Sequence, residues 1–147
     1  MRKSLKRSHS LASIVLPALF LACGGDSTSP APDIAVGNYT AVSFVTTGNS
    51  GQRNEILAGS TLVLNLNANG TTSGHLHFAA SGGSPALDAD MAGTWTRVGT
   101  TVEFNQTADT FVRDMQFELT PGLADGWDLV GDAGFSGTRI QITLKQT

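Results

Sequence analysis

The feature that most constrains this chain is a period-two alternation of apolar and polar residues, in short runs separated by Gly, Asn, Asp and Ser. The clearest run, at residues 60–67, places Leu62, Leu64 and Leu66 on one face of a strand and leads into an Asn-Ala-Asn-Gly turn. Asn and Gly accept the positive φ angles of tight turns, so a hairpin is expected there. Long helical periodicity is missing from residues 34–147. The sequence therefore predicts an all-β domain.

Further alternating runs set the number of strands. We expect strands at residues 38–45, 60–67, 71–80, 93–98, 101–105, 110–119, 126–130 and 138–145, with a short additional piece near Ile56. Sequential strands joined by short turns favour an antiparallel up-and-down meander, and about eight strands remove their exposed edges by closing into a β-barrel. An open β-sandwich is the alternative. A barrel of this size is either filled by side chains or able to hold one small ligand.

The first 22 residues differ from the rest of the chain. Four basic side chains precede an apolar stretch at residues 11–22, which is the pattern of a secretory signal peptide. About a dozen apolar residues are too few to span a bilayer, which takes about 20. The next segment is small, polar and proline-bearing, as is typical of a flexible tether. We therefore expect a signal peptide at residues 1–22, a tether at 23–33 and a β-domain at 34–147.

Residues 19–24 read Leu-Phe-Leu-Ala-Cys-Gly and resemble the lipobox of bacterial lipoproteins, in which a small residue precedes a lipidated cysteine. The resemblance implies that Cys23, the single cysteine of the chain, becomes the mature N-terminus and carries acyl chains such as palmitate. Two or three acyl chains anchor a protein stably. In that family an Asp after the cysteine commonly signals inner-membrane retention, whereas this chain has Gly24. The resemblance thus implies a lipid anchor in the outer membrane, with the protein on the periplasmic face.

Charge and composition exclude several classes of function. Without residues 1–22 the chain has five basic side chains against 12 acidic ones, a net charge of −7, which disfavours nucleic-acid binding. One cysteine excludes an internal disulfide and a cysteine-cluster metal site. The sequence shows neither a Gly-rich phosphate loop nor a nucleophile arranged with a base. We therefore predict a monomer that is not an enzyme and has no cofactor.

Two short segments, Gly37-Asn-Tyr-Thr40 and Gly93-Thr-Trp-Thr96, each open a predicted strand with a Gly, a polar residue and a large aromatic residue. Together with residues 59–70 and 137–144 they look like the bacterial lipocalin-like lipoprotein domains. That resemblance implies an up-and-down barrel, sometimes with a cavity for a small apolar molecule, and no catalytic residues. The lipocalin Gly-x-Trp signature is Gly37-x-Tyr39 in this chain.

The alternation also brings together a candidate ligand site inside the barrel. Arg97 falls on the Trp95 face, and Arg113 falls among apolar residues, where a guanidinium has to be paired or hydrated. In the functional interpretation, these arginines hold an acidic group of a small amphipathic ligand in a cavity of about 300 Å³ or more. In the structural interpretation, Arg113 lies at a barrel mouth or pairs with Glu103. The candidate ligand-binding residues are Trp95, Arg97, Phe111, Arg113, Met115 and Phe117.

Two other features of the sequence suggest different functions. His75 and His77 share one strand face and could ligate zinc or copper with Asp88 and Asp90, but that face is expected to be the solvated one, and no metal is predicted. The long loops at residues 46–54 and 80–90 give an alternative function, in which a rigid barrel uses its rim loops to bind another envelope protein.

Overall fold

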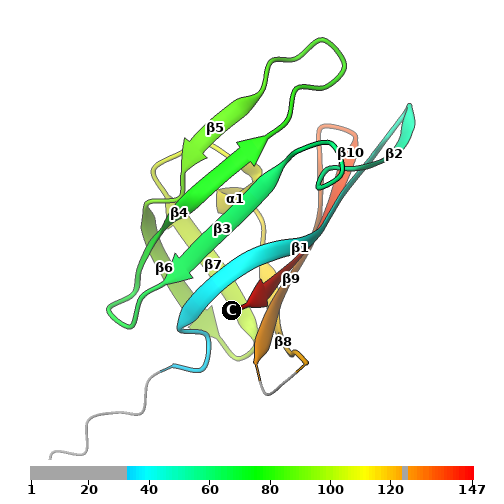
Figure 1. Cartoon of the computed structure of the whole chain (residues 1–147). Coiled ribbons are helices and arrows are strands. Elements are labelled where there is room, and N and C mark those ends of the chain that lie inside the picture. The colour runs from blue at the N-terminus through cyan, green and yellow to red at the C-terminus, as the bar shows by residue number, and fades with distance from the viewer. Residues whose placement is uncertain (1–32, 124–125) are drawn as a thin grey trace, which may run out of the picture. The chain divides into compact units, whose positions relative to one another are not determined.

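The computed structural model describes residues 33–123 and 126–147, which belong to one compact unit (Figure 1). Its strands form a closed antiparallel eight-stranded barrel with up-and-down topology, because the last strand pairs with the first. The all-β barrel prediction is confirmed, and the fold is compatible with a lipocalin-like one. The barrel strands are β1 (Gly37–Gly48), β3 (Thr61–Leu66), β4 (Thr71–Phe78), β6 (Gly93–Val98), β7 (Thr101–Gln106), β8 (Phe117–Pro121), β9 (Trp127–Phe135) and β10 (Thr138–Gln146).

Three shorter elements complete the described residues. Strand β2 (Gly51–Asn54) pairs with the end of β1, and strand β5 (Leu87–Asp90) pairs with the end of β4. A single helical turn, α1 (Phe111–Asp114), connects β7 to β8. Of the segments that we expected as long loops, residues 46–54 therefore form most of the β1–β2 hairpin, and residues 80–90 contain strand β5. Within the described residues, no helix has the length and hydropathy that crossing a membrane requires.

The hairpin of β3 and β4 shows how the sequence produces the barrel wall. The three leucines of β3 are buried, as the alternation predicts, and Gly70 closes the turn at a φ of 79°. Gly74 of β4 lies opposite Leu64 at a φ of 131°, and a Cβ there would come within 2.1 Å of the carbonyl oxygen of Val63. Because that neighbour is backbone and cannot move aside, only glycine fits this position.

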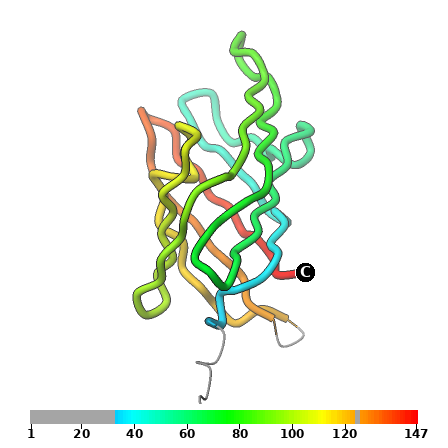
Figure 2. Tube along the Cα trace, turned by 90° about the vertical axis from the view of Figure 1, so that its left-hand side faces the viewer, coloured from blue at the N-terminus to red at the C-terminus, as the bar shows by residue number. Residues whose placement is uncertain are grey.

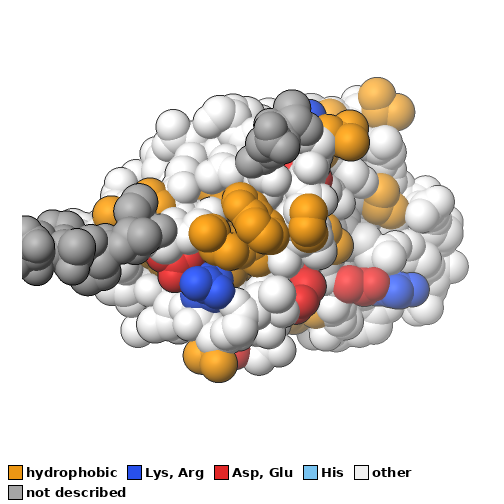
Figure 3. All heavy atoms as spheres, turned by 90° about the horizontal axis from the view of Figure 1, so that it is seen from below, with side chains coloured by type: hydrophobic (Ala, Val, Ile, Leu, Met, Phe, Trp, Pro, Cys, Tyr) orange, Lys and Arg blue, Asp and Glu red, His pale blue; other side chains and the backbone are white. Residues whose placement is uncertain are grey.

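The two ends of the barrel differ in what covers them (Figures 1 and 2). The lower end in Figure 1 contains residues 33–36, here called the entry segment, the turns at 67–70 and 99–100, the described part of the β8–β9 loop and the C-terminus. The upper end contains the β1–β2 turn, residues 79–86, α1 and the turn at 136–137. Figure 3 shows hydrophobic side chains exposed on the side seen from below, beside acidic and basic ones.

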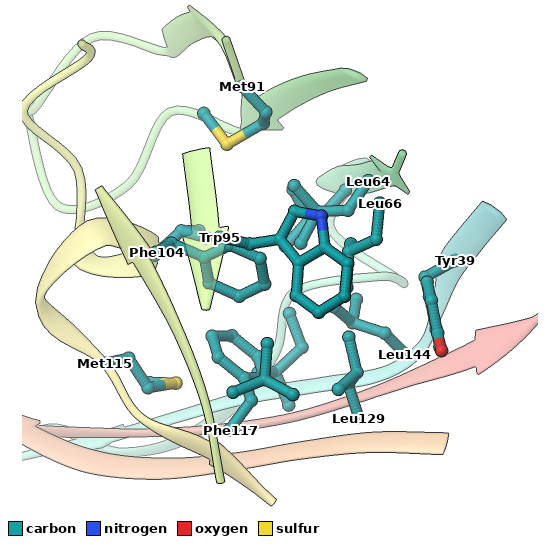
Figure 4. Packing of buried hydrophobic residues seen from close by; sticks show 14 of the residues in the cluster. Tyr39, Leu64, Leu66, Met91, Trp95, Phe104, Met115, Phe117, Leu129 and Leu144 are labelled. Atoms are coloured by element: carbon teal, nitrogen blue, oxygen red, sulfur yellow. The ribbon is translucent and has the colours of Figure 1, made fainter. Parts of the chain in front are cut away.

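Side chains from all around the wall fill the interior of the barrel (Figure 4). Tyr39, Phe44 and Phe117 are the largest fully buried ones, and each has no solvent exposure. Gly131 of β9 makes room for this packing, because a Cβ there would come within 2.3 Å of the Met115 sulfur. The side chains inside the barrel are therefore packed as closely as in an ordinary protein core.

The prediction of a strand at residues 110–119 is wrong for the first half of that segment. Residues 111–114 form α1, and strand β8 begins only at Phe117. The helical turn buries Val112, which the alternation placed on the solvent side, and exposes part of Phe111 and Arg113. Four residues are too few to separate a period of 2.0 from one of 3.6, and this turn sits at an end of the barrel, where no neighbouring strand imposes a register.

Candidate functional site

Three of the predicted ligand-binding residues belong to the packed core. Met115 and Phe117 are 1% and 0% exposed, and Trp95 is 8% exposed. The Trp95 indole donates a hydrogen bond to the Asn67 carbonyl oxygen at 3.0 Å, and the Phe117 ring lies 5.4 Å from that of Phe104 (Figure 4). A side chain that lined a ligand-sized cavity would keep accessible surface. The expected cavity is therefore not found between these side chains in the part of the chain that the structure describes.

Arg97 lies on the Trp95 face, as predicted, at the lower end of the barrel. Its Nε donates to both carboxylate oxygens of Asp33, at 2.8 and 3.0 Å, and its Nη1 donates to the carbonyl oxygen of Gly99. The hydrogen bond from Arg97 lowers the pKa of the Asp33 carboxyl group. The inward arginine is thus paired within the chain and holds the entry segment against the β6–β7 turn.

Arg113 lies at the upper end of the barrel, which agrees with the structural interpretation of a position at a barrel mouth, and the inward orientation of the functional interpretation is wrong. It stands on α1 and pairs with Asp109 at 2.5 Å and Asp114 at 3.0 Å. Glu103 accepts a hydrogen bond from Gln116 instead, at 2.6 Å. Arg113 turns outward because α1 replaces the expected strand.

Phe111, the remaining predicted residue, packs at the upper end of the barrel. Its ring lies 5.5 Å from that of Phe44 and 6.5 Å from that of Phe78. The six predicted residues therefore separate into a central core group, a lower-end ion pair and an upper-end group.

A solvent-accessible cleft of about 300 Å³ lies at the upper end, between the β1–β2 hairpin and the segment that follows β4. We call it the upper cleft. Its lining is mostly polar and includes one aromatic ring and one guanidinium. The lining residues are Thr46, Gly48, Ser50, Gly51, Arg53, Glu55, Phe78, Ser81, Ser84 and Thr138.

Glu55 is the most buried charged residue of the cleft, at 1% exposure. Its carboxylate accepts hydrogen bonds from Thr46 Oγ1 at 2.6 Å and Ser60 Oγ at 3.4 Å, and Arg53 Nη1 lies 3.1 Å from Oε2. A buried carboxylate needs such partners, because its desolvation is otherwise costly. These contacts fix Glu55 as part of the floor of the cleft.

Arg53 joins the two sides of the upper cleft. Its Nη2 donates to the carbonyl oxygen of Ala80 at 3.2 Å, so one guanidinium connects β2 to the segment after β4. Its buried Nη1 makes the ion pair with Glu55 but has no well-aligned hydrogen-bond acceptor among the described residues. The Arg53 side chain as a whole is about one third exposed, so an acidic or carbonyl group that entered the cleft could bind the accessible part of its guanidinium.

The histidine cluster predicted on β4 is present on the outer face of the β4–β5 ribbon. His77 Nδ1 lies 2.8 Å from Asp88 Oδ1, and His75 lies 3.2 Å from Asp88 and 3.4 Å from Asp90. Hydrogen bonds from His77 and His75 lower the pKa of Asp88. Within residues 33–123 and 126–147, no three His, Cys, Asp or Glu side chains are placed to hold a metal ion. The cluster joins β5 to β4 through side-chain hydrogen bonds.

Arg53 and Glu55 are not among the site residues that the sequence pattern predicts. One signal was available, since the two residues are two positions apart and such a spacing places them on one side of an extended segment. Nothing in the local sequence indicated that this side would be covered.

Comparison with known proteins found no matching family model, and no curated protein or solved structure with significant similarity.

Proposed function

We propose that this protein is a lipid-anchored, non-enzymatic binding module of a bacterial cell envelope, and that the upper cleft and the two hairpins beside it form its binding surface. The observation that carries this proposal is the cleft itself, a solvent-accessible polar recess between two projecting hairpins on a barrel whose interior is packed. A rigid barrel that displays loops at one end is a common design for binding.

The anchoring part of the proposal depends on residues 1–32, which lie outside the described residues. Its support is the resemblance of residues 19–24 to a lipobox, with Cys23 as the single lipidation site. The same resemblance supports a location on the periplasmic face of the outer membrane. The net charge of −7 after residue 22 supports binding partners other than nucleic acid.

The partner that fits the upper cleft best is a segment of another envelope protein. Strand β2 is paired only with β1, and strand β5 only with β4, in the described sheet, so both hairpins present a free backbone edge. Extended segments bind such edges through backbone hydrogen bonds. Arg53 would receive an acidic or carbonyl group of the inserted segment.

A small amphipathic ligand is the second candidate, and the size of the cleft favours it. About 300 Å³ is at the lower limit of small-molecule sites, and Phe78 offers an aromatic surface beside Arg53. This candidate keeps the carrier hypothesis but moves its site from the barrel interior to the mouth.

Photo-crosslinking in the native host tests the protein-binding proposal. A photoreactive amino acid replaces Ser50 or Ser84 in the cleft, and Val130 on the outer wall of β9 is the matched control position. We expect one adduct of defined mass at both cleft positions, absent at position 130 and lost when Arg53→Gln is added. The proposal fails if the cleft positions give no adduct, or the same adducts as position 130.

Native mass spectrometry of the full chain purified gently from host membranes tests the small-ligand candidate. A stoichiometric adduct that Arg53→Gln removes and Arg113→Gln leaves unchanged would establish a ligand in the cleft. A ligand-free mass, also after addition of host lipid extract, would exclude this candidate and leave the protein partner.

A further inference from the structure

Three aliphatic side chains are unusually exposed at the lower end of the barrel. Val98 at the β6–β7 turn is 81% exposed, Leu123 after β8 is 80% exposed, and Ile34 of the entry segment is 46% exposed. A single exposed aliphatic residue is ordinary on a protein surface. These three side chains come from different segments of the chain, and all three segments lie at the lower end.

Hydrogen bonds hold these segments next to one another. Asp33 beside Ile34 is bound by Arg97, which precedes Val98. Gln146 donates to the carbonyl oxygen of Val36 at 3.0 Å and accepts from the backbone nitrogen of Trp127 at 2.9 Å, which connects the entry segment to the β8–β9 side. The entry segment, the β6–β7 turn and the described part of the β8–β9 loop, which carry these side chains, all lie at the lower end of the barrel (Figure 1).

The chain enters the barrel at this same end. The entry segment starts at Asp33, only nine residues after Gly24, and a coil of about that length spans roughly 15 to 20 Å. With an acyl anchor on Cys23, the lower end would be held within that reach of the bilayer. Such a tether raises the effective concentration of the domain at the lipid surface. Weak apolar contacts are then sufficient to hold the lower end against the bilayer.

The charges at the lower end also suit a lipid surface. Asp33 pairs with Arg97, and Lys145 lies opposite Asp128 on the neighbouring strand, so both carboxylates have a basic residue nearby. Glu118 on the outer wall of β8 is a further carboxylate near this end.

We propose that the lower end is a membrane-contact surface, with Ile34, Val98 and Leu123 inserted at the headgroup level of the bilayer. Burial of aliphatic side chains at that level is favourable in proportion to the area removed from water. The upper cleft then points away from the lipid surface and is open to partners. This inference rests on the lipid anchor of the proposed function.

Fluorescence quenching in vesicles tests the contact. The full chain, purified from its host with its native N-terminus, is reconstituted in phosphatidylcholine vesicles that contain spin-labelled lipid. An environment-sensitive fluorescent amino acid replaces Val98 or Leu123, and Leu57, which is 86% exposed at the upper end, is the matched control position. We expect quenching at positions 98 and 123 at least threefold stronger than at position 57, and unchanged by high salt.

Vesicle flotation separates the two proposals. If the chain floats with vesicles but positions 98 and 123 are quenched no more than position 57, the membrane-contact inference is overturned and the anchor stands. If the wild-type chain floats no better than Cys23→Ser, the anchor fails and the inference fails with it. As a further check, Val98→Asp with Leu123→Asp should abolish quenching of a probe at position 34, whereas Leu57→Asp should not.

Discussion

The lower and upper ends of this barrel are closed in different ways. At the lower end, the entry segment is held by hydrogen bonds, from the Arg97 guanidinium to Asp33, from Tyr39 to the Ala35 carbonyl oxygen at 2.9 Å, and from Gln146 to that of Val36. At the upper end, the rings of Phe44, Phe78 and Phe111 pack together under longer hairpins.

This difference supports the two surfaces proposed above, one for the membrane at the lower end and one for a binding partner at the upper end. Short turns and a hydrogen-bonded entry segment make the lower end compact, which suits contact with a flat surface. Aromatic packing seals the upper end from within, so its hairpins are free to extend and to form the cleft. Substitutions at each end can test this division.

Trp95→Ala should have the largest effect, because the indole links the central core to the lower turn at residues 67–70. We expect the free energy of unfolding to fall by about 3–5 kcal/mol, from the lost apolar burial and an unpaired Asn67 carbonyl oxygen. Urea unfolding followed by circular dichroism measures this change. Trp95→Phe, which keeps most of the apolar contact, should lose clearly less. A loss below about 1 kcal/mol for Trp95→Ala would show that the lower end is not coupled to the core.

Tyr39 at the lower end should make the stability of the protein depend on pH in the alkaline range. Burial, assisted by Asp33 and Asp128, raises the pKa of this phenol, the only tyrosine in the chain, to about 12. The neutral, buried phenol stabilises the folded state, and this contribution is complete below the unfolded pKa of about 10. As the pH rises towards 12 the contribution is lost, and the free energy of unfolding falls by up to about 2–3 kcal/mol. Ultraviolet absorbance titration reports the phenol directly. A midpoint near 10 in the folded protein would contradict its burial, and Tyr39→Phe should lack this pH dependence.

Phe111→Ala tests the aromatic closure of the upper end. The ring is partly buried and contacts Phe44 and Phe78, so we expect a loss of about 1–3 kcal/mol in thermal or urea unfolding. Arg113→Ala on the same helical turn is the control, with a change within about 0.5 kcal/mol, because its ion pairs are exposed. Equal losses in the two variants would mean that charge, and not aromatic packing, holds α1.

Arg97→Ala should have the smallest effect, about 1 kcal/mol or less, because both partners of the ion pair are partly exposed. Hydrogen bonding from Arg97 keeps the pKa of Asp33 below its ordinary value of 3.8. The difference between wild type and variant should therefore be complete above pH 3.8 and disappear as the pH falls through the lowered value. Urea unfolding across that acidic range measures it. A difference that persisted at the lowest pH would indicate that Arg97 stabilises through packing instead.

The sequence predicted the regular part of the wall well. The inward faces of β3, β6, β7 and β10 follow the apolar positions of the alternation, because each of these strands has one face in a core and the other in water. The turns at residues 67–70 and 99–100 follow from their Asn and Gly content.

The irregular upper end could not be predicted in the same way. Residues 111–114 form a helical turn and not a strand, so Arg113 faces outward and the expected internal site loses one of its two arginines. The buried Glu55 depends on a hairpin and a loop that meet only in the folded chain, through Arg53 and the Ala80 carbonyl oxygen. Local alternation holds no information on such distant contacts, and the candidate binding surface lies among them.

The pairing of β1 with β10 has a consequence for the order of events during folding. The seam of the barrel joins the two ends of the domain, with Thr40 opposite Lys145 and the Thr147 backbone nitrogen bonded to the Asn38 carbonyl oxygen. Earlier hairpins can form locally, but this seam closes only after the last residues have emerged, and contacts so distant in sequence form slowly. In a chain that is exported unfolded, the sheet would keep an open edge until the C-terminus arrives, so protection from aggregation would be needed longest at that edge.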